Sequence, residues 1–218
     1  MSKKEETAVA VVEEENTSLA TTSAGAMHID AEDIDIPRIN VIQKMSQIDA
    51  PVGAIVLNKT HVLAEAETPL DTIVVAAQKG YREDIPFDED QVPRIAWTKE
   101  KADAIAAESD WPMMEFAEIT LLVKQPEGGE EEAFPFTIGD SNYAMGRINV
   151  SKNAYRSTYK RLATFAAFNR DTPLYKNIWK FSSEVLSKGK YTWHSPSLTM
   201  SKETVDESVI EFLKNFGV

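Results

Sequence analysis

The sequence contains no cysteine, and its three histidines lie far apart along the chain. The missing cysteine excludes disulfides, thiolate metal sites, iron–sulfur clusters and a cysteine nucleophile. His28, His61 and His194 include no pair at the short spacing that zinc sites use, so we expect no metal site. Phosphate-binding glycine loops and the serine-hydrolase and zinc-protease motifs are also missing, which favours a protein that is not an enzyme and needs no cofactor.

Long hydrophobic runs are absent as well. The apolar run at residues 73–77 is far shorter than the roughly 20 residues that a transmembrane helix requires. The N-terminal lysines Lys3 and Lys4 are followed by acidic residues, and no apolar core of a signal peptide comes after them. We therefore expect a soluble, intracellular protein that does not contact a membrane.

Carboxylates occur in two groups that a metal-dependent nuclease could use. Glu115 and Glu118 differ in strand parity, so they should point to opposite faces rather than hold one metal ion beside Lys124. The other group lacks the glycine of a calcium loop, and we interpret it as a solvated acidic loop. Its members are Asp84, Asp88, Glu89 and Asp90. A nuclease is therefore a weaker hypothesis than a binding protein.

The chain divides into three parts by composition. Residues 1–33 are rich in Glu, Ser, Thr and Ala and contain no aromatic residue, which predicts a disordered acidic arm. Residues 34–200 should form the folded core. Residues 201–218 predict an amphipathic C-terminal helix, with Val209, Ile210 and Leu213 on its apolar face.

Within the core, β-branched segments bounded by turn residues predict strands, and two periodic segments predict helices. Residues 116–123 and 133–138 flank a Pro-Glu-Gly-Gly turn and should pair as a hairpin. The other predicted strands are 34–42, 55–57, 72–77, 175–185 and 190–200, and the predicted helices are 98–109 and 151–169.

This order of elements favours a mainly β fold with helices. A helix between the third or fourth strand and the last two strands suits a small Greek-key barrel of the OB type, in which a helix lies between strands three and four. The C-terminal helix would be added to that barrel. A mixed α+β sheet is the alternative topology.

Charge is distributed unevenly along the chain. The net charge is −12, yet residues 141–200 hold 10 Lys and Arg against 2 Asp and Glu. The same segment holds 10 of the 19 aromatic residues. Proteins that bind single-stranded nucleic acid combine cations that follow the phosphates with aromatic rings on which bases stack, so the segment is a candidate for such an interface. A chance difference between the two halves of the surface is the alternative interpretation.

The candidate interface residues come from one helix and one strand pair. Lys152, Arg156 and Lys160 recur every four residues along a helix face. Trp179 and Phe181 share one strand face, where they are candidates either for base stacking or for core packing. The full candidate set is Lys152, Arg156, Lys160, Arg161, Lys176, Trp179, Lys180, Phe181, Lys188, Lys190, Tyr191 and Trp193.

Two stretches also carry a resemblance to known proteins. One is Ile-Pro-Arg-Ile-Asn-Val-Ile-Gln at residues 36–43, followed by Val-Gly-Ala-Ile at 52–55 and the strand at 73–77. The other runs from Ile-Trp-Lys-Phe at 178–181 to Lys-Gly-Lys-Tyr-Thr-Trp at 188–193, with Pro196. Together they cover less than half of the chain. They resemble a group of small bacteriophage proteins regarded as single-stranded-DNA-binding or recombination-accessory proteins with an OB-type core, which implies a phage origin but transfers no individual site residue.

The leading hypothesis is a sequence-nonspecific single-stranded-DNA-binding protein that supports phage DNA replication or recombination in the host cytoplasm. Its expected partners are single-stranded DNA and replication or recombination proteins of the phage or the host. The C-terminal helix is a candidate surface for a homo-oligomer. The alternative hypothesis is a non-enzymatic phage protein that acts through protein interactions or belongs to the virion.

Overall fold

The chain was analysed as a computed structural model, which describes residues 35–86 and 88–215. The described part is mainly β, with antiparallel strands and several helices, as the sequence predicts. The expected disordered arm at residues 1–33 lies outside the described residues, and so does the end of the chain at 216–218. No helix in the described part is both long enough and apolar enough to cross a membrane.

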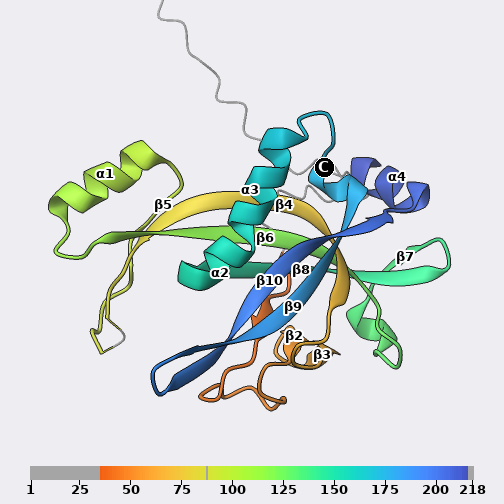
Figure 1. Cartoon of the computed structure of the whole chain (residues 1–218), viewed down its shortest axis with the longest axis horizontal. Helices are drawn as coiled ribbons and strands as arrows, with labels where there is room; N and C mark the ends of the chain where they lie inside the picture. Colours follow the sequence, from red (N-terminus) through yellow and green to blue (C-terminus); the bar gives the residue numbers. More distant parts are fainter. Residues whose placement is uncertain (1–34, 87, 216–218) are drawn as a thin grey trace, which may run out of the picture.

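The strands form two sheets, and all pairs of neighbouring strands are antiparallel. The small sheet has the order β1-β2-β3, and its strands are β1 (Ile39–Val41), β2 (Ile55–Leu57) and β3 (His61–Ala64). The strands of the large sheet are β4 (Leu70–Glu83), β5 (Ile95–Ala96), β6 (Met113–Lys124), β7 (Phe136–Ile138), β8 (Ser141–Ser151), β9 (Asn177–Lys188) and β10 (Tyr191–Thr204). Their order is β10-β9-β4-β6-β8-β7, and β5 pairs with β4 (Figure 1).

The helices join and cover these strands. The predicted helix at 98–109 is present as α1, and the Thr98 hydroxyl caps it by accepting the N–H of Lys101 at 3.3 Å. The α-helices are α1 (Lys99–Glu108), α2 (Lys152–Ser157), α3 (Tyr159–Phe168) and α4 (Glu207–Asn215). Two short 3-10 turns are η2 (Glu131–Ala133) and η3 (Leu174–Lys176).

The large sheet contains a Greek key. Strands β4, β6 and β8 lie side by side, and β9 then returns through α2 and α3 to pair with β4. The spatial order β9-β4-β6-β8 is that of a Greek key, and its helical connection lies between the third and fourth strands. The hydrogen-bonded order of the described strands ends at β10 on one side and at β7 on the other, so it does not form a closed ring.

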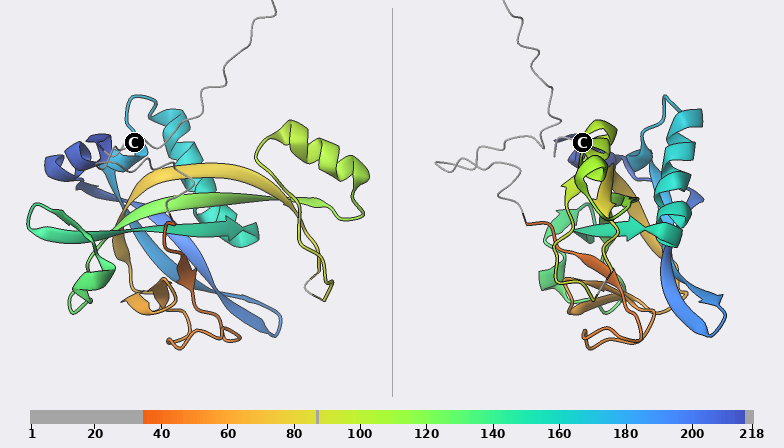
Figure 2. Two further views of the ribbon diagram at one scale, coloured as in Figure 1. Left: turned by 180° about the vertical axis from the view of Figure 1, so that it is seen from behind. Right: turned by 90° about the vertical axis from the view of Figure 1, so that its left-hand side faces the viewer.

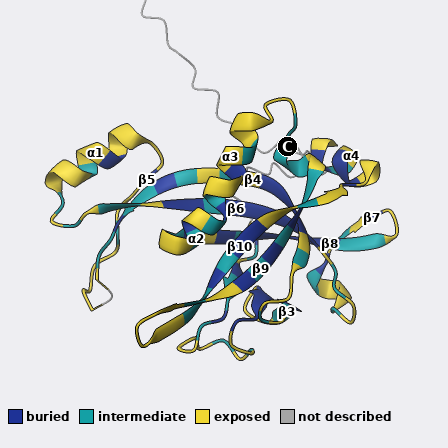
Figure 3. Ribbon diagram, viewed as in Figure 1, coloured by how far each residue is buried: buried dark blue, intermediate teal, exposed yellow. Residues whose placement is uncertain are grey.

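The core fills both faces of the large sheet. Leu121 and Leu122 are adjacent on β6 and point to opposite faces, yet neither has any exposed surface. Leu121 belongs to a cluster with residues of α2, α3, β9 and the small sheet, whereas Leu122 packs with residues of α4. Figure 3 shows the buried residues along the central strands and the exposed residues on helix surfaces and loop tips.

The C-terminal helix packs on this core instead of offering a free apolar face. Val209, Ile210 and Leu213 are 2%, 6% and 0% exposed, and they contact the cluster that contains Ile73 and Leu122. This apolar area is already buried within the same chain, so it is not free for the homo-oligomer that the sequence predicts, and that oligomer stays a prediction.

The predicted hairpin between residues 116–123 and 133–138 is wrong. β6 pairs with β4 and with β8, while β7 pairs only with the first residues of β8. No element was expected at residues 139–150, where two glycines and five polar residues weaken the local strand signal. β8 is therefore stabilised by its pairing with β6, which extends from Phe116 to Lys124 of β6.

The predicted helix at 151–169 is broken near its middle. Thr158 takes φ −121° and ψ −85°, which ends α2 before α3 begins. Its side chain is fully buried, and its hydroxyl donates to the Ala154 carbonyl. The break means that Lys152 and Lys160 do not lie along one straight helix face.

Candidate nucleic-acid interface

A groove of about 540 Å³ runs between α3 and the edge strand β10. Figure 1 shows α2 and α3 crossing in front of the large sheet beside β10. Arg156, Lys160 and Arg161 contribute cations to the groove, and Phe165 and Phe168 contribute rings. Strand residues Trp179, Leu198, Thr199 and Met200 form the opposite wall. The groove thus brings together three of the predicted cations with three aromatic side chains.

The three groove cations have no carboxylate partner among the described residues, which leaves their charge available to a ligand. All three are exposed. Arg161 Nη1 donates to Ser197 Oγ and to the Leu198 carbonyl, both at 3.0 Å, and these bonds hold the guanidinium against β10. The Lys160 ammonium lies 5.9 Å from the centre of the Tyr155 ring. An anion that enters the groove would therefore meet cations that are already positioned.

Two other predicted cations are neutralised by carboxylates from distant parts of the chain. Lys152 Nζ lies 3.1 Å from Asp84 Oδ1. Lys180 Nζ lies 2.5 Å from Asp71 Oδ1 and 4.0 Å from Glu203 Oε2. The hydrogen bond to Asp71 raises the pKa of Lys180. Both lysines are thus occupied in ion pairs, and the structure does not bring them into the groove.

The structure corrects the stacking role of two predicted rings. Trp179 is 2% exposed and Phe181 has no exposed surface. Trp179 Nε1 donates to the Leu174 carbonyl at 3.2 Å, and the ring meets Phe165 edge-on with centroids 5.4 Å apart. Of the two interpretations of this strand face, core packing is the one that holds, because a buried ring offers no face to a base.

An exposed ring that is not among the predicted residues lies at the rim of the groove. Phe168 is 84% exposed, and Met200 across the groove is 52% exposed. A sequence signal was available, because Phe168 directly precedes Asn169 and Arg170, where the apolar stripe of the helix has ended. A large exposed aromatic beside unpaired cations is the arrangement that base stacking requires.

The remaining predicted residues gather elsewhere. Lys188, Lys190, Tyr191 and Trp193 lie at or near the tip of the β9–β10 hairpin, which Figure 1 shows projecting away from α3. Tyr191 is 67% exposed, with the Lys190 ammonium 5.4 Å from its ring centre, and Trp193 is half-buried. Gly189 takes φ 60° in the two-residue loop, where glycine carries no steric penalty.

The last predicted cation also differs from its expected place. Lys176 is exposed, but it ends the short turn η3 and is not part of a strand. The candidate set therefore separates into a groove, a hairpin tip and isolated cations. It does not form one continuous surface.

The candidate catalytic carboxylates are likewise separated. Glu115 forms an ion pair with Lys79, whereas Glu118 Oε1 lies 3.0 Å from Arg147 Nη1. Residues 35–86 and 88–215 contain no group of three or more acidic, histidine or cysteine side chains placed to hold a metal ion.

Comparisons with known proteins identify no family for this chain. No model of a protein family matches the chain, and searches of curated proteins and of solved structures gave no match.

Proposed function

We propose that this protein binds single-stranded DNA without sequence preference, through the groove between α3 and β10. The single observation that carries the proposal is the placement of three cations that no described carboxylate pairs, Arg156, Lys160 and Arg161, beside the exposed ring of Phe168. Cations for the phosphates and a flat ring for a base are the two components that single-strand binding needs.

The chemistry of the groove favours binding that does not depend on sequence. The guanidinium and ammonium groups would contact phosphates, which every nucleotide carries. Phe168 would stack on a base, a contact worth roughly 1–3 kcal/mol that any base can make. The exposed thioether of Met200, opposite Phe168, adds an apolar surface for the same base.

An OB-type core and a phage role are part of this proposal. The Greek-key order, with its helices between the third and fourth strands, supports an OB-like arrangement without requiring a closed barrel. The resemblance of residues 36–55 and 178–193 to phage single-strand-binding and recombination-accessory proteins supports a role in phage DNA replication or recombination in the host cytoplasm. The hairpin tip with Lys188, Lys190 and Tyr191 is a second contact that a longer strand would reach.

Fluorescence anisotropy with labelled oligo-dT of about 4 to 16 nucleotides tests the proposal. Binding should weaken as salt rises, with a log–log slope of about −0.7 for each phosphate contacted. The double variant Arg156→Gln, Lys160→Gln should make this slope shallower by about 1.4. A matched double variant at the ion-paired lysines, Lys152→Gln and Lys180→Gln, should leave the slope close to that of the wild type.

Two results would reject the groove as the interface. The first is no binding of oligo-dT at low salt. The second is a salt slope that becomes equally shallow in both double variants. That result would mean that net charge alone determines the affinity. Thermal melts of each variant establish that the folded protein is being compared.

One observation favours the alternative of a protein-interaction role. Val92, Ile95 and Trp97 are 91%, 54% and 43% exposed on the segment that leads into α1. Exposed apolar residues that gather on one segment are typical of a protein contact. A protein that binds no DNA and self-associates in light scattering, with Ile95→Asp abolishing the association, would support this alternative.

A further inference from the structure

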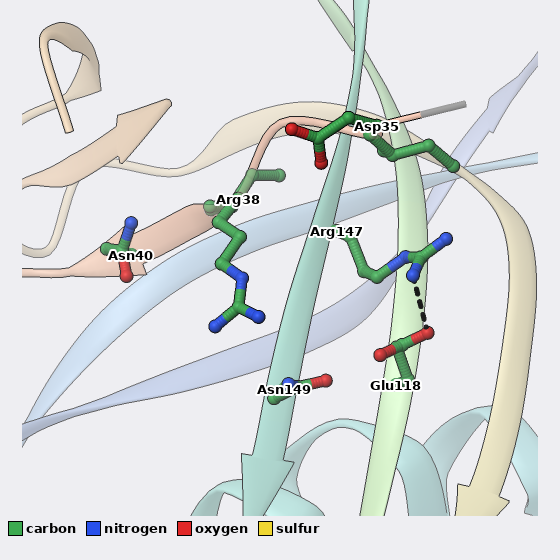
Figure 4. A pocket seen from close by; sticks show the side chains of 8 residues that line it. Asp35, Arg38, Asn40, Glu118, Arg147 and Asn149 are labelled. Carbon is green, nitrogen blue, oxygen red and sulfur yellow. Dashed lines mark ion pairs between the residues drawn. The ribbon is translucent and has the colours of Figure 1, made fainter. Parts of the chain in front are cut away.

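A second polar pocket, of about 180 Å³, lies where the segment before β1 crosses β6 and β8. Figures 1 and 2 show this crossing on the side of the large sheet opposite to α2 and α3, away from the groove. Asp35 and Arg38 come from the segment before β1, Asn40 from β1 itself, Arg147 and Asn149 from β8, and Glu118 from β6 (Figure 4).

The segment is held firmly over the sheet, so the pocket has a fixed shape. The Arg147 N–H donates to the Pro37 carbonyl at 2.8 Å, and Arg38 forms a parallel bridge with Arg147. Ile39 packs directly on Gly146, where a Cβ atom would come within 2.7 Å of the Ile39 side chain. The two arginines are thus brought together by backbone pairing.

Two buried hydrogen-bond donors beside this pocket have no acceptor among the described residues. Arg147 uses Nη1 for Glu118, but its buried Nε has no acceptor. The buried Nδ2 of Asn40 has none either. Arg38 has no ion-pair partner among the described residues, and Figure 4 shows its guanidinium directed toward Asn149 and away from Asp35. Buried donors of this kind are normally satisfied, so these two leave hydrogen-bonding capacity unused beside the pocket.

The charges select the type of acceptor. Glu118 compensates Arg147. Asp35 also lines the pocket, but no ion pair joins it to Arg38 among the described residues, and Figure 4 shows the Arg38 guanidinium turned away from it. Planar guanidinium groups bind oxyanions through parallel hydrogen bonds, and amides add further donors. The pocket is smaller than the roughly 300–1,000 Å³ of ordinary small-molecule sites, which suits a single phosphate-sized group.

We infer that Arg38, Asn40, Arg147 and Asn149 form a binding site for a phosphate-type oxyanion. The site does not depend on the groove, because it lies on the other side of the sheet and shares no residue with it. Two sources share this chemistry, namely a small phosphate ion or ester and the phosphodiester backbone of a nucleic acid.

NMR titration of the full chain tests the inference, with inorganic phosphate in one arm and oligo-dT in the other. The Arg147 Nε–H and Asn40 Nδ2–H₂ signals should shift and saturate, while sodium chloride at equal ionic strength should not reproduce the shift. Saturation by phosphate identifies a small anion as the source. Saturation by oligo-dT alone identifies the nucleic-acid backbone.

Substitutions distinguish specific anion binding in this pocket from non-specific electrostatic attraction to the protein surface. Arg38→Gln should weaken the response by about tenfold or more, because a charged hydrogen-bonding partner is lost. Lys44→Gln removes an exposed cation that lies six positions after Arg38 in the sequence and does not line the pocket, so it should change nothing. Arg147→Lys keeps a positive charge beside Glu118 but removes Nε, so it should also lose the response while remaining folded.

No saturable shift in either arm, or equal responses of Arg38→Gln and Lys44→Gln, would overturn the inference. The groove variants Arg156→Gln and Lys160→Gln should leave the phosphate response intact. A failure at this pocket is therefore distinguishable from a failure of DNA binding at the groove.

Discussion

Gln43 and His194 exchange two hydrogen bonds across 151 positions of sequence. Gln43 Nε2 donates to the His194 carbonyl at 2.7 Å, and the His194 N–H donates to Gln43 Oε1 at 3.0 Å. The side-chain amide thereby pairs with the backbone of the edge strand β10 as a neighbouring strand would. At its other end the same N-terminal segment is bonded to β8 through Pro37, so it spans from β8 to β10.

Gln43→Ala should destabilise the fold by about 1–3 kcal/mol, because the His194 N–H and carbonyl lose their partners. Urea unfolding followed by circular dichroism measures this loss. Gln47→Ala is the matched control, because Gln47 is exposed and should change stability by less than about 0.5 kcal/mol. Equal stability of the two variants would mean that the segment is not held by this pair.

Glu83 should contribute stability that is sensitive to acid. Hydrogen bonds from the Arg94 guanidinium, with smaller contributions from the Ser109 hydroxyl and the Arg94 N–H, lower its pKa from 4.5 to about 2. Because the pKa is lower in the folded state than in the unfolded state, this stabilisation is complete above about pH 4.5 and is lost as the pH falls toward 2.

The variant Glu83→Gln tests that assignment. It should lower the unfolding free energy at pH 7, and its stability should fall less than that of the wild type between pH 4.5 and pH 2. Glu108→Gln is the control, because Glu108 is exposed and lies 3.5 Å from the same arginine. Parallel stability profiles for the wild type and Glu83→Gln would contradict the prediction.

Phe168 and Trp179 should respond to substitution in opposite ways. Phe168→Ala should reduce oligo-dT affinity by about 1–3 kcal/mol, or roughly 5- to 150-fold, with little change in melting temperature. Trp179→Ala should reduce the unfolding free energy by about 3–5 kcal/mol, because it empties a buried site next to Phe165. Anisotropy titrations and thermal melts of both variants provide the comparison, and unchanged affinity in Phe168→Ala would remove the stacking role.

The C-terminal helix should behave as part of the core. Leu213→Ala should reduce the unfolding free energy by about 2–5 kcal/mol, because Leu213 is fully buried. The molar mass in light scattering should not change. Lys214→Ala is the exposed control at the adjacent position. A variant that dissociates an oligomer while keeping wild-type stability would show instead that α4 is an interface.

Much of the secondary structure could be predicted from local patterns. The segment at 55–57 is β2, and the segments at 72–77 and 116–123 lie within β4 and β6. The Ala-rich stretch at residues 98–109 predicts α1 to within about one residue at each end. These signals act over a few residues, and local sequence therefore contains them.

The pairing of the strands and the break in the central helix were not predictable in this way. β8 has weak strand propensity and is stabilised mainly by β6, and α2 ends where the buried Thr158 side chain bonds back to Ala154. Both outcomes depend on what surrounds the residue, which local periodicity does not record.

The sequence by itself determined that cations and aromatic rings are concentrated in residues 141–200, because that is a matter of composition. Only the tertiary structure decided which of them face a ligand. Asp84 neutralises Lys152 from 68 positions away, the sheet buries Trp179, and Phe168 is left exposed beside cations that have no ion pair within the described part of the chain. Burial and ion pairing join residues that are distant in the chain, so they follow from strand register and packing and not from any local pattern.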